Sequence, residues 1–141
     1  MGEGMDLGAG RQRMLLSQLA DGRFHSGEQL ALLLGISRTL VWREVELLRD
    51  AYALDIHAVR GRGYRLSQPL ELLHERRILE ALPAHQGELL RQLQLLLSVD
   101  STSNHLLKQL PLGIDSGVVC CSEQQTAGRG RRGRSWVSPF G

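Results

Sequence analysis

The chain has 141 residues, of which 42% are hydrophobic, so it can bury one modest core or two small ones. Its net charge of +2 is unevenly distributed, with −2 at 1–10, +3 at 11–65, −3 at 66–127 and +4 at 128–141. This distribution excludes a uniformly basic surface that coats nucleic acid, and it indicates two separate anion-facing surfaces. Residues 1–10 contain no apolar signal segment and no apolar run is long enough to cross a bilayer, so we expect a cytoplasmic protein without a membrane partner.

The first predicted helix follows a glycine-rich segment, residues 1–10, that we expect to be disordered. It begins at Arg11 and carries apolar residues at helical spacing: Met14, Leu15 and Leu19. Gly22 ends it, because glycine readily adopts the left-handed conformation that closes a helix.

A second and a third helix form a helix-turn-helix pattern. The sequence S-G-E-Q at 26–29 is a capping box, in which the Ser26 hydroxyl accepts from a free N–H and Gln29 reaches back to the cap. Three leucines are expected to bury one face of the second helix: Leu30, Leu33 and Leu34. Gly35 ends that helix, and Ser37 caps a third helix that runs to about Asp50.

The third helix separates an apolar stripe from a polar face. The stripe consists of Val41, Val45 and Leu48, and the opposite face carries Arg38, Thr39, Trp42, Arg43 and Glu46. Such a face fits the DNA major groove, where arginine reaches guanine edges or phosphates and threonine contacts a phosphate or a thymine methyl. Trp42 either stacks on bases or sugars there or covers a neighbouring domain.

A basic hairpin is predicted after this helix. Residues 54–59 and 64–66 read as strands, and the intervening R-G-R-G supplies glycines for a tight turn, so Arg60, Arg62 and Arg65 project from a wing. Wing arginines commonly contact the phosphate backbone or the minor groove. The alternative is a small helical domain with a solvated basic hairpin, but the order of caps, turn glycine, polar face and wing favours DNA binding. The predicted DNA-binding residues are Ser37, Arg38, Thr39, Trp42, Arg43, Arg60 and Arg62.

A second unit is predicted beyond a boundary at 67–70, where Pro69 cannot continue a β-ladder. The predicted elements are a helix at 70–82, a loop at 84–91, a strand at 92–99, a capping turn at 100–104 with a helix after it, a loop at 111–117 and a strand at 118–125. Neither a disulfide framework nor a metal site is expected, because Cys120 and Cys121 are adjacent and lack any Cys/His spacing.

The predicted fold class is α+β. A winged helix-turn-helix at 11–67 and a linker helix at 68–83 precede the incomplete start of a mixed α/β domain at 84–141. Two or three strands cannot bury both faces of a sheet, so we expect a fragment, an early stop or a truncated gene product.

The segment G-R-G-R-R-G-R at 128–134 is the most distinctive stretch of the chain. It is neither a Walker A loop nor a convincing G-x-G-x-x-G helix start, because no Lys-Ser/Thr follows and Pro139 comes soon after. It directly follows a strand, which favours a folded anion-binding loop over a disordered RNA-binding tract.

Three motifs together resemble the biotin protein ligases that double as repressors of the biotin synthesis operon. They are S-G-E-Q-L, V-D-S-T-S-N-H-L-L and E-Q-Q-T-A-G-R-G-R-R-G-R-S-W-V-S-P-F-G. The resemblance implies that biotin and ATP, with Mg²⁺, give biotinyl-AMP, and that a lysine of the biotin carboxyl carrier protein then takes the biotinyl group. It also implies a homodimer that binds operator DNA with the adenylate as corepressor.

By this resemblance the site residues fall into two groups. Gly128, Arg129, Gly130 and Arg131 would line the biotin carboxylate and the phosphate, with Arg131 catalytic. Thr102, Ser103 and Asn104, facing Gln125, would hydrogen-bond the ureido ring, with Ser101 as an alternative to Thr102. Trp136 either packs near the adenylate or fills the core beneath the loop.

The family's catalytic lysine, its adenosine-binding segments and its C-terminal domain would lie beyond Gly141, so we expect that the isolated chain does not ligate biotin. Two other hypotheses stay open. One is a stand-alone winged-helix regulator whose arginine loop is a second DNA clamp, and the other is a related ligase for lipoate.

Overall fold

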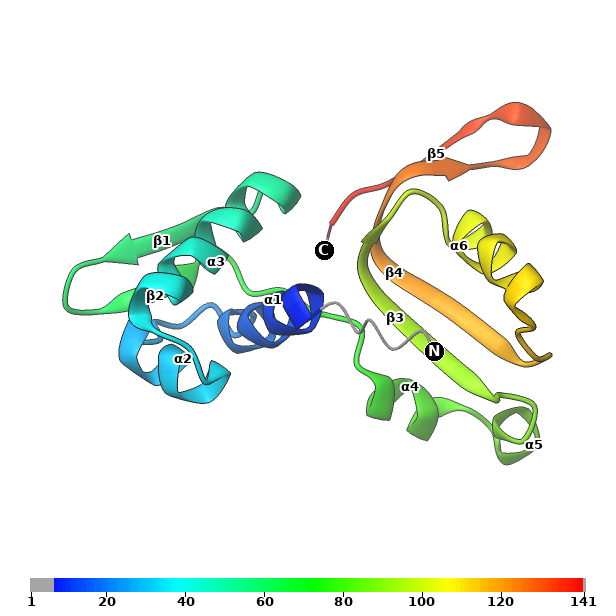
Figure 1. The fold of residues 1–141 in the computed structure, drawn as a ribbon, viewed down its shortest axis with the longest axis horizontal. Helices are drawn as coiled ribbons and strands as arrows, with labels where there is room; N and C mark the ends of the chain where they lie inside the picture. Colours follow the sequence, from blue (N-terminus) through cyan, green and yellow to red (C-terminus); the bar gives the residue numbers. More distant parts are fainter. Residues whose placement is uncertain (1–6, 141) are drawn as a thin grey trace. The chain divides into compact units, whose positions relative to one another are not determined.

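The computed structural model describes residues 7–140 and separates into two compact units, one ending at Glu71 and the other beginning at Leu72 (Figure 1). The first unit contains α1 (Leu7–Leu19), α2 (Gly27–Leu34), α3 (Arg38–Tyr52), β1 (Ile56–Val59) and β2 (Gly63–Leu66). The second contains α4 (Glu75–Ala81), α5 (Ala84–Gly87), β3 (Gln92–Val99), α6 (Thr102–Gln109), η1 (Leu110–Leu112), β4 (Val118–Arg129), η2 (Arg131–Gly133) and β5 (Ser135–Ser138). The mixed α+β class predicted from the sequence is confirmed.

The helix ends of the first unit follow the predicted local signals. Ser26 makes a complete capping box with Gln29, and Ser37 accepts a hydrogen bond from the Leu40 N–H at 3.2 Å. Gly35 has a φ of 64°, so it supplies the left-handed residue that ends α2. The first helix begins at Leu7, so residues 7–10, which we expected to be disordered, are helical; residues 1–6 lie outside the described part.

The three helices bury a compact apolar core, but two of the predicted core residues were wrong. Met14 is 48% exposed and Leu33 is 50% exposed, whereas their neighbours Leu16 and Ala31 are buried. Both errors fall in leucine-rich runs, in which adjacent apolar residues leave the buried face of a helix undecided until its neighbours pack. The predicted α3 stripe of Val41, Val45 and Leu48 is fully buried.

A carboxylate lies inside this core. Glu44 of α3 is 7% exposed, and its Oε1 accepts from Arg11 Nη1 of α1 at 3.0 Å. A buried carboxylate requires such a partner, since an unpaired charge is costly in an apolar interior. The pair therefore links the first helix to the third, and the sequence analysis did not anticipate it.

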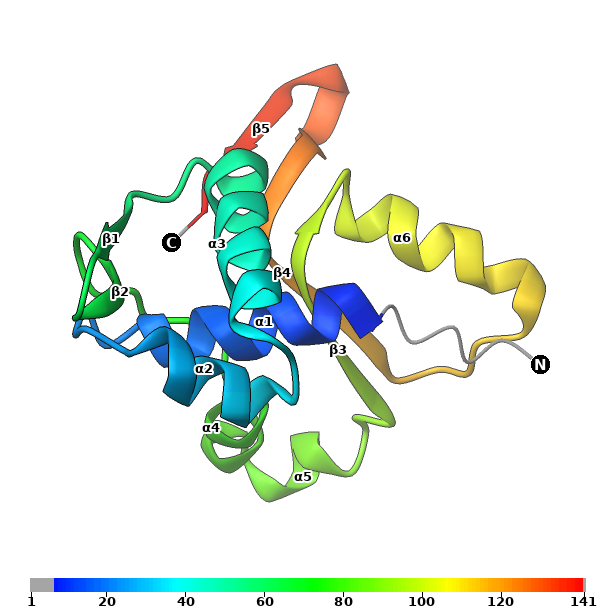
Figure 2. The ribbon, with the colours of Figure 1, turned by 60° about the vertical axis from the view of Figure 1, so that its left-hand side comes forward.

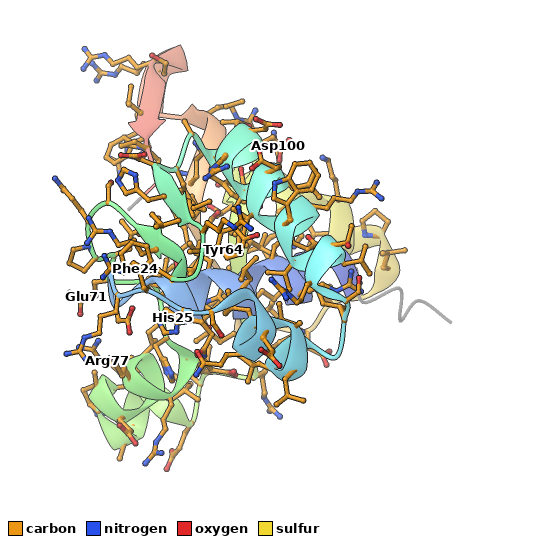
Figure 3. The ribbon with its side chains drawn as sticks, turned by 90° about the vertical axis from the view of Figure 1, so that its left-hand side faces the viewer. Phe24, His25, Tyr64, Glu71, Arg77 and Asp100 are labelled. Carbon is orange, nitrogen blue, oxygen red and sulfur yellow. The ribbon has the colours of Figure 1, made fainter. Side chains whose placement is uncertain are left out.

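The wing is an antiparallel hairpin of β1 and β2, with Ile56 opposite Leu66. Each strand is four residues long, so Leu54 and Asp55, which we expected in the first strand, precede it. The backbone N–H and C=O of His25 both bond Tyr64, at 2.8 and 2.9 Å, which fastens β2 to the α1–α2 connection (Figure 3). Gly63 has a φ of 100°, and a Cβ there would overlap the His25 carbonyl, so only glycine fits.

The second unit is built on a three-stranded sheet with β4 in the centre (Figure 2). β3 and β4 are parallel and joined through α6, which packs against β4, while β4 and β5 form an antiparallel hairpin with a register shift between Gln125 and Gly128. Parallel neighbours require such a crossover connection.

Several predictions for this unit were wrong in detail. α4 begins at Glu75 instead of residue 70, the 84–91 loop contains α5, and β4 continues four residues beyond 125, so Gly128 and Arg129 belong to a strand. β5 was not predicted, and its Trp136 is 61% exposed, so of the two alternatives for Trp136 the one in which it fills a core is wrong. β4 extends beyond Gln125 because residues 125–129 pair with β5 across the hairpin that the arginine segment closes.

The helices in the described part of the chain are all too short or too polar to cross a membrane. The two cysteines are free thiols, and burial, followed by the neighbouring Cys121, raises the pKa of Cys120. Within residues 7–140 no group of three or more His, Cys, Asp or Glu side chains is arranged to hold a metal ion.

Candidate functional sites

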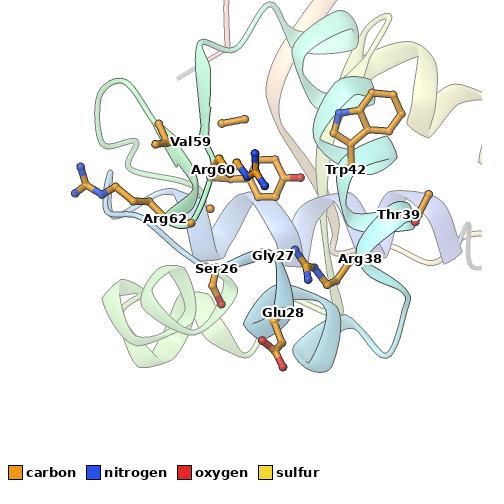
Figure 4. Close-up of a pocket in the computed structure, with 13 residues that line it drawn as sticks. Ser26, Gly27, Glu28, Arg38, Thr39, Trp42, Val59, Arg60 and Arg62 are labelled. Carbon is orange, nitrogen blue, oxygen red and sulfur yellow. The ribbon is translucent and has the colours of Figure 1, made fainter.

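The first unit carries a basic groove of about 800 Å³ between α3, the start of α2 and the wing (Figure 4). Its lining combines three arginines with one acidic residue, Glu28, and two aromatic side chains, Trp42 and Tyr64. The three arginines are Arg38, Arg60 and Arg62. A concave surface with excess positive charge attracts a polyanion, and its aromatic side chains offer flat faces to sugars or bases.

Five of the seven predicted DNA-binding residues line this groove, namely Arg38, Thr39, Trp42, Arg60 and Arg62. Arg43 is exposed on α3 but lies outside the lining, and the Ser37 hydroxyl is occupied in capping α3. Trp42 is 54% exposed and faces the groove, as a base- or sugar-contacting side chain must. Ser26, Gly27 and Tyr64 also line the groove and were not predicted, because they reach it only where the wing folds back against the first turn of α2.

The second unit carries a polar cluster where β3 ends and α6 begins. Gln125 Oε1 on β4 accepts from the Thr102 N–H at 2.9 Å and from Thr102 Oγ1 at 3.2 Å. Ser101 is only 2% exposed and caps α6 by accepting from the Asn104 N–H at 3.5 Å. Thr102, and not Ser101, therefore hydrogen-bonds Gln125 in this structure, while Ser103 is exposed and makes no hydrogen bond to Gln125 within the described residues.

Asp100 organises the same cluster, and the sequence analysis assigned it no role. Its carboxylate accepts from the Ser101 N–H at 2.7 Å, from Asn104 Nδ2 at 3.4 Å and from Lys108 Nζ at 3.5 Å. The hydrogen bond from the Ser101 N–H contributes most to lowering the pKa of Asp100, so the group stays ionised at neutral pH. Because Asn104 donates to Asp100, its carbonyl oxygen is directed to the Arg129 guanidinium, from which it accepts a hydrogen bond.

The remaining predicted residues lie along the β4–β5 hairpin. Gly128 is buried in β4 against β5, where a Cβ would come within 2.8 Å of the Trp136 carbonyl oxygen. The Gly130 N–H donates to the Arg134 carbonyl at 2.7 Å and closes the hairpin. Arg131 lies in the exposed 3₁₀ turn at the tip, and within the described residues it makes no hydrogen bond or ion pair with Thr102, Asn104 or Arg129.

A shallow hollow of about 450 Å³ runs along this hairpin beside Gln125, Gly128 and Trp136. Its walls come from β4 and β5, so it exists only because the two strands pair. The polar cluster and this hollow share Gln125, which makes them parts of one candidate ligand site.

Two protein-family models match the chain. Residues 11–65 match the HTH domain, and residues 95–141 match the biotin/lipoate A/B protein ligase family. The first match covers the helices and wing with their basic groove, and the second covers the polar cluster and the arginine hairpin.

Curated relatives match across both units. The bifunctional ligase/repressor BirA of Salmonella typhimurium is 44% identical over 127 residues, that of Escherichia coli 42% over 127 residues and that of Bacillus subtilis 36% over 128 residues. Each match covers 90% of this chain but only 37–38% of the relative. The chain thus spans little more than a third of the length of the proteins that it resembles, and the predicted resemblance to bifunctional ligase/repressors is confirmed.

Proposed function

We propose that this chain, a homologue of the bifunctional ligase/repressors that joins an HTH domain to a segment of the biotin/lipoate ligase family, serves as the DNA-binding and biotin-binding part of a biotin-responsive repressor and biotin protein ligase. The observation that carries the proposal is the presence, in one chain, of a basic helix–wing groove and of a polar cluster beside an arginine hairpin.

The first unit supplies the repressor half of the proposal. Arg38, Thr39 and Trp42 would meet base edges or sugars in the major groove, while Arg60 and Arg62 would contact phosphates from the wing. The groove lining, which gathers these side chains from two separate elements, supports this assignment.

The second unit supplies the ligand half. A ureido ring presents one acceptor oxygen and two N–H donors, so it requires a site with both kinds of partner. Gln125 directs its carbonyl oxygen to Thr102 and keeps two amide N–H donors, and the Thr102 hydroxyl oxygen keeps acceptor capacity. This donor and acceptor set fits biotin, and the neighbouring Arg129 fits its carboxylate.

The reaction we propose joins two anions. A biotin carboxylate oxygen attacks the α-phosphorus of ATP, the bond from that phosphorus to the bridging oxygen breaks, and pyrophosphate leaves. A carrier-protein lysine amine then attacks the acyl carbon of biotinyl-AMP and releases AMP and a proton. Arg129, Arg131 and the glycine backbone around them would offset the charge repulsion of the first step, with Mg²⁺ accompanying ATP.

The partners follow from this chemistry and are proposals as well. They are operator DNA, the biotin carboxyl carrier protein and, when the adenylate is bound, a second copy of the protein, all in the cytoplasm. The alternative of a stand-alone regulator with a second DNA clamp is weakened because residues 95–141 match a ligase family.

The ligand half is tested in the natural protein that carries these residues, by following pyrophosphate release from ATP with biotin or lipoate as the acid. Arg131→Gln is expected to slow biotin-dependent release by about 100-fold, the usual cost of removing one charge-stabilising donor. Arg132→Gln is the matched control, since it removes the same charge from the next residue of the same turn. Equal effects of both variants would contradict the role of Arg131, and release that depends on lipoate alone would contradict biotin as the substrate.

The repressor half is tested by measuring affinity for duplexes selected from a random pool, with and without biotin plus ATP. We expect binding to strengthen when both ligands are present, and to weaken in Arg38→Gln. Binding that ignores the ligands would support the stand-alone regulator.

A further inference from the structure

Two arginine side chains of the wing lie over the aromatic ring of Phe24. The guanidinium carbon of Arg62 lies 4.1 Å from the ring centroid, and that of Arg65 lies 5.1 Å from it. Both distances fall within the range of about 6 Å over which a cation is attracted to an aromatic face. Phe24 precedes α2 and belongs neither to α3 nor to the wing, and it is part of no sequence motif.

The backbone around Phe24 is fixed in place. The next residue, His25, pairs with Tyr64 of β2 through both its N–H and its C=O. On the N-terminal side of Phe24, Asp21 Oδ1 accepts a hydrogen bond from the Arg23 N–H at 2.8 Å. The same Asp21 oxygen lies 2.9 Å from His25 Nε2. The ring is therefore a rigid platform beside the wing (Figure 3).

Arg62 lies in the turn of the wing, where its N–H donates to the Val59 carbonyl at 3.0 Å. Its long side chain is exposed at the edge of the groove. Ordering a long side chain on binding costs free energy, and a side chain ordered beforehand avoids that cost. A guanidinium stacked by its face keeps its N–H groups at the edge available for a phosphate.

We infer that Phe24 is a positioning residue for DNA binding, which holds the Arg62 guanidinium in place before a phosphate of the duplex arrives. The inference rests on the proposed DNA-binding function and adds to it a residue that does not itself line the groove. Arg65 lies over the same ring, and its buried Nε has no hydrogen-bond partner among the described residues.

The same hairpin provides the matched control. Arg60 is a wing arginine two residues away that also lines the groove, yet within the described residues its guanidinium stacks on no ring. Loss of the Phe24 ring should therefore weaken the contribution of Arg62 and leave that of Arg60 unchanged.

The test is binding of the full chain to a fluorescein-labelled 30-base-pair duplex, followed by anisotropy between about 50 and 200 mM KCl. Phe24→Leu is expected to weaken binding about threefold at every salt concentration, while Phe24→Tyr, which keeps the ring, binds as the unchanged protein does. Arg62→Gln removes a phosphate contact, so it should reduce the slope of log affinity against log salt by about 0.9.

Double variants separate positioning from a general effect on the fold. In an Arg62→Gln background, Phe24→Leu should cause no further loss, whereas in an Arg60→Gln background it should cause the full threefold loss. A threefold loss in both backgrounds would overturn the inference, as would a Phe24→Tyr protein that binds no better than Phe24→Leu.

A measurement on the unchanged protein covers the case in which Phe24→Leu fails to fold. Nitrogen-15 relaxation of the arginine side chains should give Arg62 Nε a higher order parameter than Arg60 Nε, and equal values would overturn the inference. If the unchanged protein binds no duplex at any salt concentration, the proposed DNA-binding function fails and the inference fails with it. Loss of the double-variant pattern alone removes only the role of Phe24.

Discussion

The two units of this chain are each stabilised by a different kind of internal interaction. In the first, ten apolar side chains are buried: Leu15, Leu16, Leu19, Leu30, Ala31, Val41, Val45, Leu48, Ile56 and Leu66. In the described part of the second, Leu97, at 7% exposed, is the only buried apolar side chain, and the buried polar residues are Ser101 and Glu123. The second unit relies on strand ladders and on hydrogen bonds such as that from the Leu73 N–H to Glu123 at 2.7 Å.

The difference follows from the elements that each unit contains. Three helices and the wing enclose the core of the first unit, whereas a three-stranded sheet with α6 packed against β4 cannot bury both of its faces. The first unit has one exposed tryptophan, Trp42, and the second has one, Trp136. The unfolding of one unit can therefore be followed by tryptophan fluorescence in a variant whose other tryptophan is changed to phenylalanine.

The largest expected effect is on the core of the first unit. Leu48→Ala should lower its free energy of unfolding by about 3 kcal/mol, because a fully buried leucine is replaced by a cavity. Urea unfolding followed at Trp42 measures the loss. Leu47→Ala, at a residue 41% exposed, is the control and should change stability by less than about 0.5 kcal/mol. An equal loss in the Trp136 signal would show that the two units unfold together.

The next effect concerns the hairpin of the second unit. Gly128→Ala places a Cβ within 2.8 Å of the Trp136 carbonyl oxygen, so β5 must shift and the unit should lose about 2 kcal/mol. Trp136 fluorescence during urea unfolding reports the change. Gly87→Ala, where an added Cβ meets nothing within 4 Å, should be neutral or slightly stabilising. Similar losses in both variants would contradict the close approach of β5 to β4.

Helix caps should weigh about equally in the two units, because they depend on one local hydrogen bond. Ser37→Ala and Ser101→Ala are each expected to cost about 1 kcal/mol, the first in the Trp42 signal and the second in the Trp136 signal. Ser37→Asn should restore most of the loss, since asparagine also caps helices well. A Ser101→Ala protein as stable as its parent would show that the buried hydroxyl does not cap α6 in solution.

The smallest effect is electrostatic. The pKa of Asp100 is lowered chiefly by the Ser101 N–H, so its carboxylate stabilises the second unit above the usual aspartate value of 3.8 and loses this contribution as the pH falls through the lowered pKa. Asp100→Asn should therefore melt at a lower temperature than its parent at pH 7, and the difference in melting temperature should narrow as the pH falls through the lowered pKa. Thermal melts at a series of pH values from 7 downward measure this difference, and a difference that stays constant across the series would contradict the role of the carboxylate.

Much of the candidate site could be read from the sequence, because motif residues are close along the chain. The strand at Gln92–Val99 and the cap at the start of α6 follow from an apolar run and a Ser/Thr-rich turn. The contact between Thr102 and Gln125, in contrast, joins residues 23 positions apart, and in the structure it depends on the pairing of β3 with β4. Arg131, which we expected near the biotin carboxylate and the phosphate, lies in the turn at the tip of the hairpin that follows β4.

The sequence by itself determined where α2 begins and ends, where α3 begins, which face of α3 is apolar and where the chain turns. These features depend on hydrogen bonds and backbone angles within a few residues, as at Ser26, Gly35 and Ser37. Only the tertiary structure decided which leucines of α1 and α2 are buried, that Glu44 pairs with Arg11, that Phe24 stacks beneath the wing and that Gly128 admits β5. Those features depend on contacts between residues that are far apart in the sequence, and no local sequence pattern specifies which of these residues come into contact.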